Sequence, residues 1–168
     1  MRFLLDTHTF LWFALNDSKL SQEALALIIE PAYDILISPA SYWEIAIKVS
    51  LGKYQIPGAF QEWIEHQLVV NSFEILPIAI AHAARVTTLP FHHRDPFDRL
   101  LAAQALTEEI PIISNDEILD AYSITRRWWS AIATWRKRNE NRATPFRSFT
   151  HYPIHFHHPL PPIAVFHL

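Results

Sequence analysis

Short apolar segments alternate with longer helix-like segments along most of this chain. The apolar segments, residues 2–6, 34–38, 73–76 and 111–114, have the length and composition of buried strands. The helix-like segments between and after them are, in chain order, residues 7–15, 18–29, 39 or 41 to 51, 59–70, 78–88, 95–106 and 117–122. This alternation is typical of an α/β domain with a mostly parallel central sheet.

Acidic residues occupy places where such a sheet would gather them. Asp6 ends the first strand, and Asp116 comes just past the end of the last one. Because ligands bind at the carboxyl ends of strands in such sheets, these two acids are expected to share a site. Glu44 is the only acid in an apolar helix, and Asp98 lies in the first turn of another. Four carboxylates together would repel one another unless they held a divalent cation, which beside phosphate indicates phosphodiester chemistry.

Each of these acids also has a purely structural explanation. Asp6 and Asp116 could cap the helices that follow them. Glu44 could form a surface ion pair with Lys48, four residues further along the same helix. Both explanations remain open from the residues alone.

Asp95 and Asp98 share the start of one helix, and their structural explanation is the strongest. Asp95 can be the N-cap, Pro96 the first helical residue and Asp98 the third, where a negative charge favours the helix dipole. In the functional interpretation Asp98 faces the edge of the sheet, while Arg99 faces elsewhere, toward phosphate.

Composition narrows the class of protein. The chain has 168 residues, half of them hydrophobic, which suits one domain with a substantial core and an appendage. The absence of cysteine excludes disulfides, zinc thiolate sites and a cysteine nucleophile. The N-terminal apolar run is interrupted by Asp6 and His8, and no run is long enough to span a membrane. We therefore expect a soluble, cytoplasmic protein.

The C-terminal segment differs from the rest of the chain. Residues 126–168 hold seven of the 14 basic residues but only one of the 17 acidic ones, so the remainder is acidic. Residues 130–168 also contain five of the 12 prolines and five of the ten histidines. We expect this segment to be an irregular, poorly ordered tail. Its histidines are a weak indication of a metal site, because they have neither cysteines nor a folded frame around them.

The four acids stand in four stretches that together resemble the PIN-domain ribonucleases, and among them the VapC-type toxins of bacterial toxin–antitoxin pairs. The stretches are Leu4-Leu5-Asp6-Thr7-His8-Thr9-Phe10-Leu11-Trp12, Ser41-Tyr42-Trp43-Glu44-Ile45-Ala46-Ile47-Lys48, His93-Arg94-Asp95-Pro96-Phe97-Asp98-Arg99-Leu100-Leu101-Ala102-Ala103-Gln104-Ala105 and Ile112-Ile113-Ser114-Asn115-Asp116. The resemblance covers residues 1–129, which we predict to be a PIN-like nuclease domain.

The resemblance implies a three-layer α/β/α fold and a metal-dependent endoribonuclease. Asp6, Glu44, Asp98 and Asp116 match the family's catalytic acids, which bind Mg²⁺ or Mn²⁺, and Asp95 is a possible auxiliary. Members of the family cleave single-stranded or loop RNA and usually form homodimers. A cognate antitoxin typically covers the toxin, and the apolar side chains of Phe10, Trp12 and Phe13 could receive it. Core packing is the other use of these three side chains.

The tail departs from the family, whose members usually end soon after a segment like residues 122–129. A shifted reading frame after the usual end is one explanation, and an RNA-binding extension is the other, since arginine and aromatic side chains suit phosphate and base stacking.

The mechanism expected of such a site is hydrolysis by metal-activated water, leaving a 5′-phosphate and a 3′-hydroxyl. Thr7 or Ser114 could hydrogen-bond the phosphate or a water on the metal. One alternative is a catalytically inactive PIN-like module that binds RNA or protein. Another is an aspartyl-phosphate enzyme with Asp6 as nucleophile, which His8 disfavours because such enzymes would have a second aspartate at that position.

Overall fold

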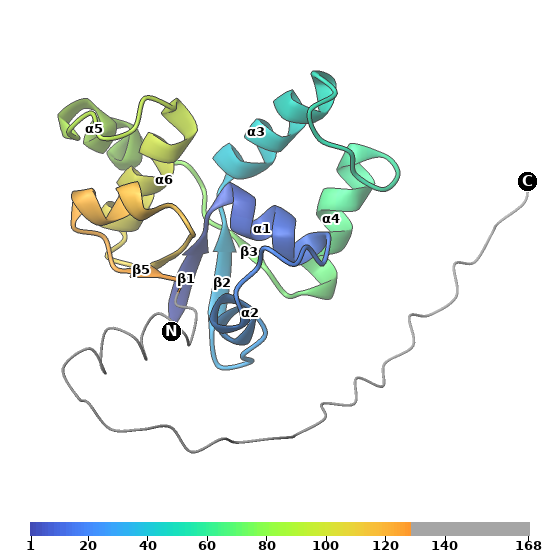
Figure 1. The fold of residues 1–168 in the computed structure, drawn as a ribbon. Coiled ribbons are helices and arrows are strands. Elements are labelled where there is room, and N and C mark those ends of the chain that lie inside the picture. The colour runs from blue at the N-terminus through green and yellow to red at the C-terminus, as the bar shows by residue number, and fades with distance from the viewer. Residues whose placement is uncertain (129–168) are drawn as a thin grey trace, which may run out of the picture.

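Five parallel strands form the centre of the fold, in the order β3-β2-β1-β4-β5 (Figure 1). The structure is a computed structural model, and it describes residues 1–128 of the chain. β1 lies in the middle of the sheet, where Leu4 is in register with Leu36 of β2 and with Ile112 of β4. Every pairing is parallel, in agreement with the mostly parallel sheet predicted from the sequence.

Helices connect the strands as the alternating pattern predicts. In chain order the elements are β1 (Arg2–Leu5), α1 (Thr7–Ala14), α2 (Gln22–Ile28), β2 (Asp34–Ile37), α3 (Pro39–Ser50), α4 (Phe60–Val70), β3 (Glu74–Ile75), α5 (Ile80–Thr88), α6 (Pro96–Thr107), β4 (Ile112–Ile113), the 3₁₀ helix η1 (Glu117–Tyr122) and β5 (Arg126–Arg127).

Helix ends are marked by residues with clear local roles. Ser21 caps α2 as predicted, its hydroxyl accepting a hydrogen bond from the backbone N–H of Ala24. Ser38 caps α3 in the same way, so this helix begins at Pro39 rather than Ser41. Gly52 follows the end of α3 with φ +68°, a conformation that glycine adopts without strain.

The two faces of the sheet are covered by different helices, which makes the predicted three layers. One apolar cluster joins Phe3, Leu5 and Ile37 of the sheet to buried side chains of α1, α2, α3 and α4. The other joins Leu4 and Ile112 to α6 and η1. Successive residues of β1 therefore point to opposite layers, as the two-residue period of a strand requires. Burial on both faces explains why the buried residues of β1, β2 and β4 are all apolar.

The sequence pattern did not predict β5. Its two residues are arginines, and it pairs with β4 at the edge of the sheet. Arg126 is fixed there because its guanidinium donates hydrogen bonds to both carboxylate oxygens of Asp120 and to the carbonyl of Ser114. No apolar period marks such a strand, since tertiary hydrogen bonds hold it in place.

The tail predicted for residues 130–168 lies outside the described residues. Within residues 1–128, none of the helices has the length and apolar character needed to cross a bilayer.

Candidate functional site

Asp6 and Asp116 meet at the carboxyl edges of the neighbouring strands β1 and β4. Ser114, which is fully buried just after β4, connects the two acids. Its hydroxyl donates a hydrogen bond of 2.9 Å to Asp6 Oδ2 and accepts one of 3.0 Å from the backbone N–H of Asp116. The order of strands therefore brings together two residues that are 110 positions apart in the sequence.

Asp98 joins them from the first turn of α6. The pKa of its carboxyl is raised from the ordinary value of 3.8 to about 7. Burial is the main cause, the negative charges of Asp95, Asp6 and Glu44 contribute, and His93 acts in the opposite direction. Carboxylates influence each other in this way only at short range. Asp98 therefore shares one electrostatic environment with Asp6 and Glu44.

Asp6 is buried, with only 6% of its surface exposed. Burial raises the pKa of its carboxyl, His8 and the hydroxyl of Ser114 act in the opposite direction, and Glu44 adds a smaller increase. Asp6 precedes α1, but its side chain makes no capping hydrogen bond to that helix. Asp6 is thus the N-cap residue by position, but capping does not account for its carboxylate, which accepts a hydrogen bond from Ser114.

Glu44 lies on the buried face of α3 and is only 4% exposed. Its Oε1 accepts a short hydrogen bond from Lys48, so the expected ion pair is present but is not a surface pair. Burial lowers the pKa of Lys48, but the interactions with Glu44 and Tyr54 outweigh it and the pKa is raised overall. The other oxygen, Oε2, is buried and has no hydrogen-bond partner among the described residues.

A polar chain continues from Glu44 to the start of α1. Lys48 Nζ lies 3.4 Å from the hydroxyl of Tyr54, which lies 3.1 Å from His8 Nε2. This chain anchors Lys48, whose hydrogen bond to Glu44 goes to Oε1 and not to Oε2. The lysine thus leaves one oxygen of Glu44 available to another ligand.

Asp95 and Asp116 are both N-cap residues, as their structural explanations predict. Asp95 Oδ1 accepts a 2.8 Å hydrogen bond from the N–H of Phe97. Asp116 Oδ1 accepts a 2.9 Å bond from the N–H of Ile118 at the start of η1. Asp116 has a second interaction through Oδ2, so capping explains only half of its carboxylate.

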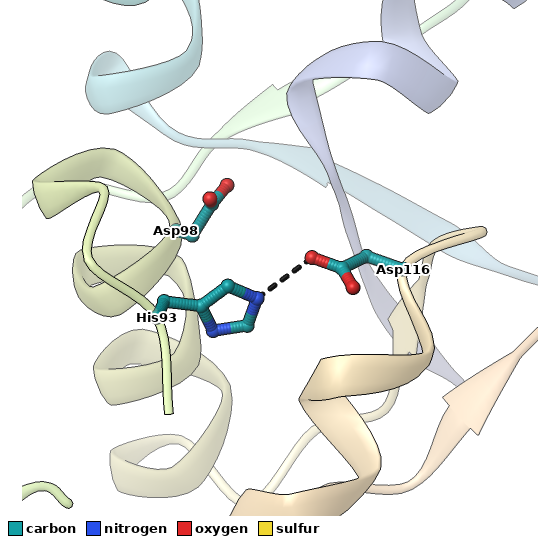
Figure 2. Close-up of side chains that lie close together, drawn as sticks. All are labelled: His93, Asp98 and Asp116. Atoms are coloured by element: carbon teal, nitrogen blue, oxygen red, sulfur yellow. Dashed lines mark hydrogen bonds and ion pairs between the residues drawn. The ribbon is translucent and has the colours of Figure 1, made fainter. Parts of the chain in front are cut away.

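That second interaction is with His93, which the sequence analysis did not single out. His93 Nε2 lies 2.7 Å from Asp116 Oδ2 (Figure 2). Ligand atoms of His93, Asp98 and Asp116 all lie within 4.8 Å of one another. His93 stands in the loop between α5 and α6, where no periodic pattern marks a residue. The sequence signal for His93 is its position two residues before Asp95, the N-cap of α6.

Arg99 does not face phosphate, and that expectation was wrong. The side chain is buried and donates hydrogen bonds to the carbonyls of Val86, Leu89 and Pro90. Its guanidinium also lies 3.9 Å from the ring centre of Phe91. Arg99 therefore holds the end of α5 and the loop that leads to His93.

The three aromatic side chains of α1 divide between two uses. Phe10 is fully buried in the core, so it is not available to a partner protein. Phe13 is partly buried and packs on Phe73, with ring centres 5.5 Å apart. Trp12 lies between His8 and Trp128, at centre distances of 5.9 and 5.5 Å. Core packing therefore accounts for most of this predicted apolar face.

The donor set of the site suits a hard divalent cation. The four acids offer only oxygen, which Mg²⁺ and Mn²⁺ prefer. The buried Oε2 of Glu44 has no partner within residues 1–128, although burying an unpaired carboxylate oxygen is costly. Burial and, to a smaller extent, the neighbouring acids raise the pKa of Asp98, so the ionised carboxylate is disfavoured without a counter-charge. A cation bound among these oxygens would relieve both conditions.

Comparison with known proteins agrees with this geometry. The sequence matches the PIN domain family over residues 3–124. No individually curated protein matches the sequence significantly. The chain belongs to the PIN-domain family.

Solved structures share the fold at low sequence identity. One is a chain of VapBC2 from Rickettsia felis, determined with a DNA fragment from the promoter; it is 17% identical, with TM-score 0.59, and the match covers 77% of this chain and 100% of that one. A chain of FitAcB from Neisseria gonorrhoeae is 19% identical, with TM-score 0.53 and coverages of 74% and 95%. A chain of VapBC-1 from nontypeable Haemophilus influenzae is 16% identical, with TM-score 0.53 and coverages of 77% and 98%.

Proposed function

We propose that this protein is a metal-dependent endoribonuclease and acts as the toxin of a toxin–antitoxin pair. The observation that carries the proposal is the meeting of four carboxylates from four separate segments, with one buried oxygen of Glu44 left unpartnered among the described residues. A structural cluster of acids would be expected to neutralise itself with basic side chains. Here Lys48 engages one oxygen of one acid only.

Asp6, Glu44, Asp98 and Asp116 would hold one or two Mg²⁺ ions, with Mn²⁺ as an alternative. A bound Mg²⁺ supplies a polarised phosphate and an activated water for hydrolysis. Ser114 links the carboxylate of Asp6 to the backbone of Asp116, because its hydroxyl donates to Asp6 Oδ2 and accepts from the N–H of Asp116. No protein nucleophile is needed for this chemistry, and RNA is the substrate that the sequence motifs favour.

The toxin role rests on two independent likenesses. The sequence stretches around the four acids resemble those of VapC-type toxins. The fold is shared with chains of VapBC and FitAcB assemblies. We therefore propose a cognate antitoxin as partner, a homodimer as the working form, and a cytoplasmic location.

The test is an RNA cleavage assay on purified wild-type protein, Asp6→Asn and Asp98→Asn, with Mg²⁺ and with EDTA. Asp34→Asn is the matched control, because Asp34 is an exposed acid at the amino end of β2, the opposite end of the sheet. We expect cleavage by the wild type and Asp34→Asn in Mg²⁺ only, and a loss of at least about 100-fold in the two site variants. Full activity of Asp6→Asn would refute the site, and cleavage that persists in EDTA would refute the role of the metal.

The same variants test the toxin role in cells. Expression of the wild type should arrest growth, and Asp98→Asn or co-expression of a small protein encoded beside it should relieve the arrest. Growth arrest by Asp98→Asn equal to that of the wild type would contradict a toxin that acts through cleavage.

A further inference from the structure

His93 has a defined set of partners on all sides of its ring. The side chain is buried in the loop between α5 and α6. Its ring stacks on Tyr122 at an interplanar angle of 9°, with centres 5.4 Å apart. Nδ1 lies 3.2 Å from the Tyr122 hydroxyl, and Nε2 lies 2.7 Å from Asp116 Oδ2. Because each ring nitrogen of His93 has a polar partner, those partners decide which nitrogen carries a hydrogen.

Asp116 determines the hydrogen on Nε2. An ionised carboxylate only accepts hydrogen bonds, so a 2.7 Å contact requires a hydrogen on Nε2. The Tyr122 hydroxyl agrees with this assignment. It accepts a 2.9 Å hydrogen bond from the backbone N–H of His93, which leaves its single hydrogen free to point at Nδ1. In this arrangement Nε2 carries the hydrogen that faces Asp116, and Nδ1 accepts the hydrogen of the Tyr122 hydroxyl.

A nitrogen that carries a hydrogen has no lone pair for a metal ion. By distance alone His93, Asp98 and Asp116 would make a mixed set of metal ligands. The hydrogen bonds exclude His93 from such a set as long as the contact with Asp116 is kept. Its function must therefore be exerted through Asp116.

We propose that His93 is a positioning residue, which orients Asp116 toward the metal without binding the metal itself. The inference deepens the proposed function and rests on it. Asp116 is held at Oδ1 by the N–H of Ile118 and at Oδ2 by His93. Each oxygen retains a second lone pair that could bind a cation, and a ligand atom of Asp98 lies within 4.8 Å of one of Asp116. Partners of this kind fix ligand orientation, and their removal typically weakens metal binding about 10–100-fold.

The first experiment reads the hydrogen directly and needs neither metal nor RNA. Long-range ¹H–¹⁵N spectra of the full chain should show His93 with hydrogen on Nε2 and with Nδ1 as acceptor, assigned by the loss of these signals in His93→Gln. Saturating Mg²⁺ should leave that pattern in place. A ring with hydrogen only on Nδ1, or loss of the Nε2 hydrogen when Mg²⁺ binds, would overturn the proposal.

The second experiment measures the Kd for Mn²⁺ by titration calorimetry. His93→Leu removes the donor and should weaken binding about 10–100-fold. His93→Gln places an amide N–H near the position of Nε2 and should restore most of the affinity. Tyr122→Phe keeps the stacked ring but loses the hydroxyl, so it should weaken binding less than His93→Leu. Unchanged affinity in His93→Leu, or no recovery in His93→Gln, would overturn the proposal.

The outcomes separate this proposal from the proposed function. If the protein binds Mn²⁺ with the expected pattern but cleaves no RNA, the function fails and the positioning role stands. If it cleaves RNA in an Asp98-dependent manner while His93→Leu binds Mn²⁺ normally, only the positioning role fails. A wild-type protein that binds no Mn²⁺ would overturn both. Thermal unfolding shows whether each variant is folded. If His93→Leu is not, the Kd of Tyr122→Phe for Mn²⁺ tests the positioning role in its place.

Discussion

Replacing Asp98 with asparagine should stabilise the metal-free protein at high pH. The pKa of the carboxyl is raised from 3.8 to about 7, mainly by burial and then by neighbouring acids. The native state therefore holds its proton more tightly than the unfolded state does. Stability linked to this proton is fully present below the unfolded pKa near 4 and is lost as pH rises to 7. Above pH 7 the ionised carboxylate opposes folding.

The size of the effect follows from the same shift. Since each tenfold change in proton affinity corresponds to about 1.4 kcal/mol, the elevation sets an upper bound of about 4 kcal/mol. Asp98 is part exposed, and solvent screening reduces this to about 1–2 kcal/mol. Asp98→Asn should then raise the Tm at pH 8 by about 3–6 °C. Near pH 4 the carboxyl is neutral in the native state, so the gain should nearly vanish.

Thermal unfolding in EDTA at pH 8 and pH 4, followed by circular dichroism, measures the difference. Asp34→Asn serves as the control with the same change in charge, and its Tm should shift equally at both pH values. A Tm change for Asp98→Asn that is independent of pH would refute the reasoning, because it would show that the pKa of Asp98 is not raised in the native state.

Three further predictions follow from the site and its supports. Mg²⁺ at about 100 times its Kd should stabilise the wild type at pH 8 by about 2.7 kcal/mol, measured by thermal unfolding, and should stabilise Asp98→Asn much less. Ser114→Ala removes the hydroxyl that joins Asp6 and Asp116, and should cost about 1–2 kcal/mol in a urea titration and lower the affinity for Mn²⁺ in calorimetry. Arg99→Lys keeps the charge but not the fork that bonds three carbonyls, and should destabilise by about 2–4 kcal/mol in the same titration; a loss below about 0.5 kcal/mol would contradict its anchoring role.

The sequence pattern was sufficient for the type of fold because that pattern reflects burial. Residues of β1 and β2 are buried on both faces, so they read as continuous apolar runs, and the helices between them require parallel pairing. The order of the strands is not local information, and the pattern left it undetermined. β5 is held by a guanidinium rather than by apolar contacts, so it carries no strand signal.

The candidate site divides in a similar way. Asp6 and Asp116 could be placed at one edge because strand ends can be located in a sequence. Asp98 and Glu44 were candidates as acids in apolar helices, but only the family resemblance put them in the same site, since their helices reach it by tertiary packing. The role of His93 depends on a hydrogen bond to a residue 23 positions away, and that of Arg99 on bonds to carbonyls up to 13 positions away. Residue patterns do not encode such contacts.

Anomalous diffraction from crystals grown with Mn²⁺ tests the central claim most directly, because it locates the ion without reference to activity. The account predicts an anomalous peak bounded by oxygens of Asp6, Glu44, Asp98 and Asp116, with His93 Nε2 bonded to Asp116 and not to the ion. A peak coordinated by His93, or no peak among the four carboxylates at saturating Mn²⁺, would contradict it.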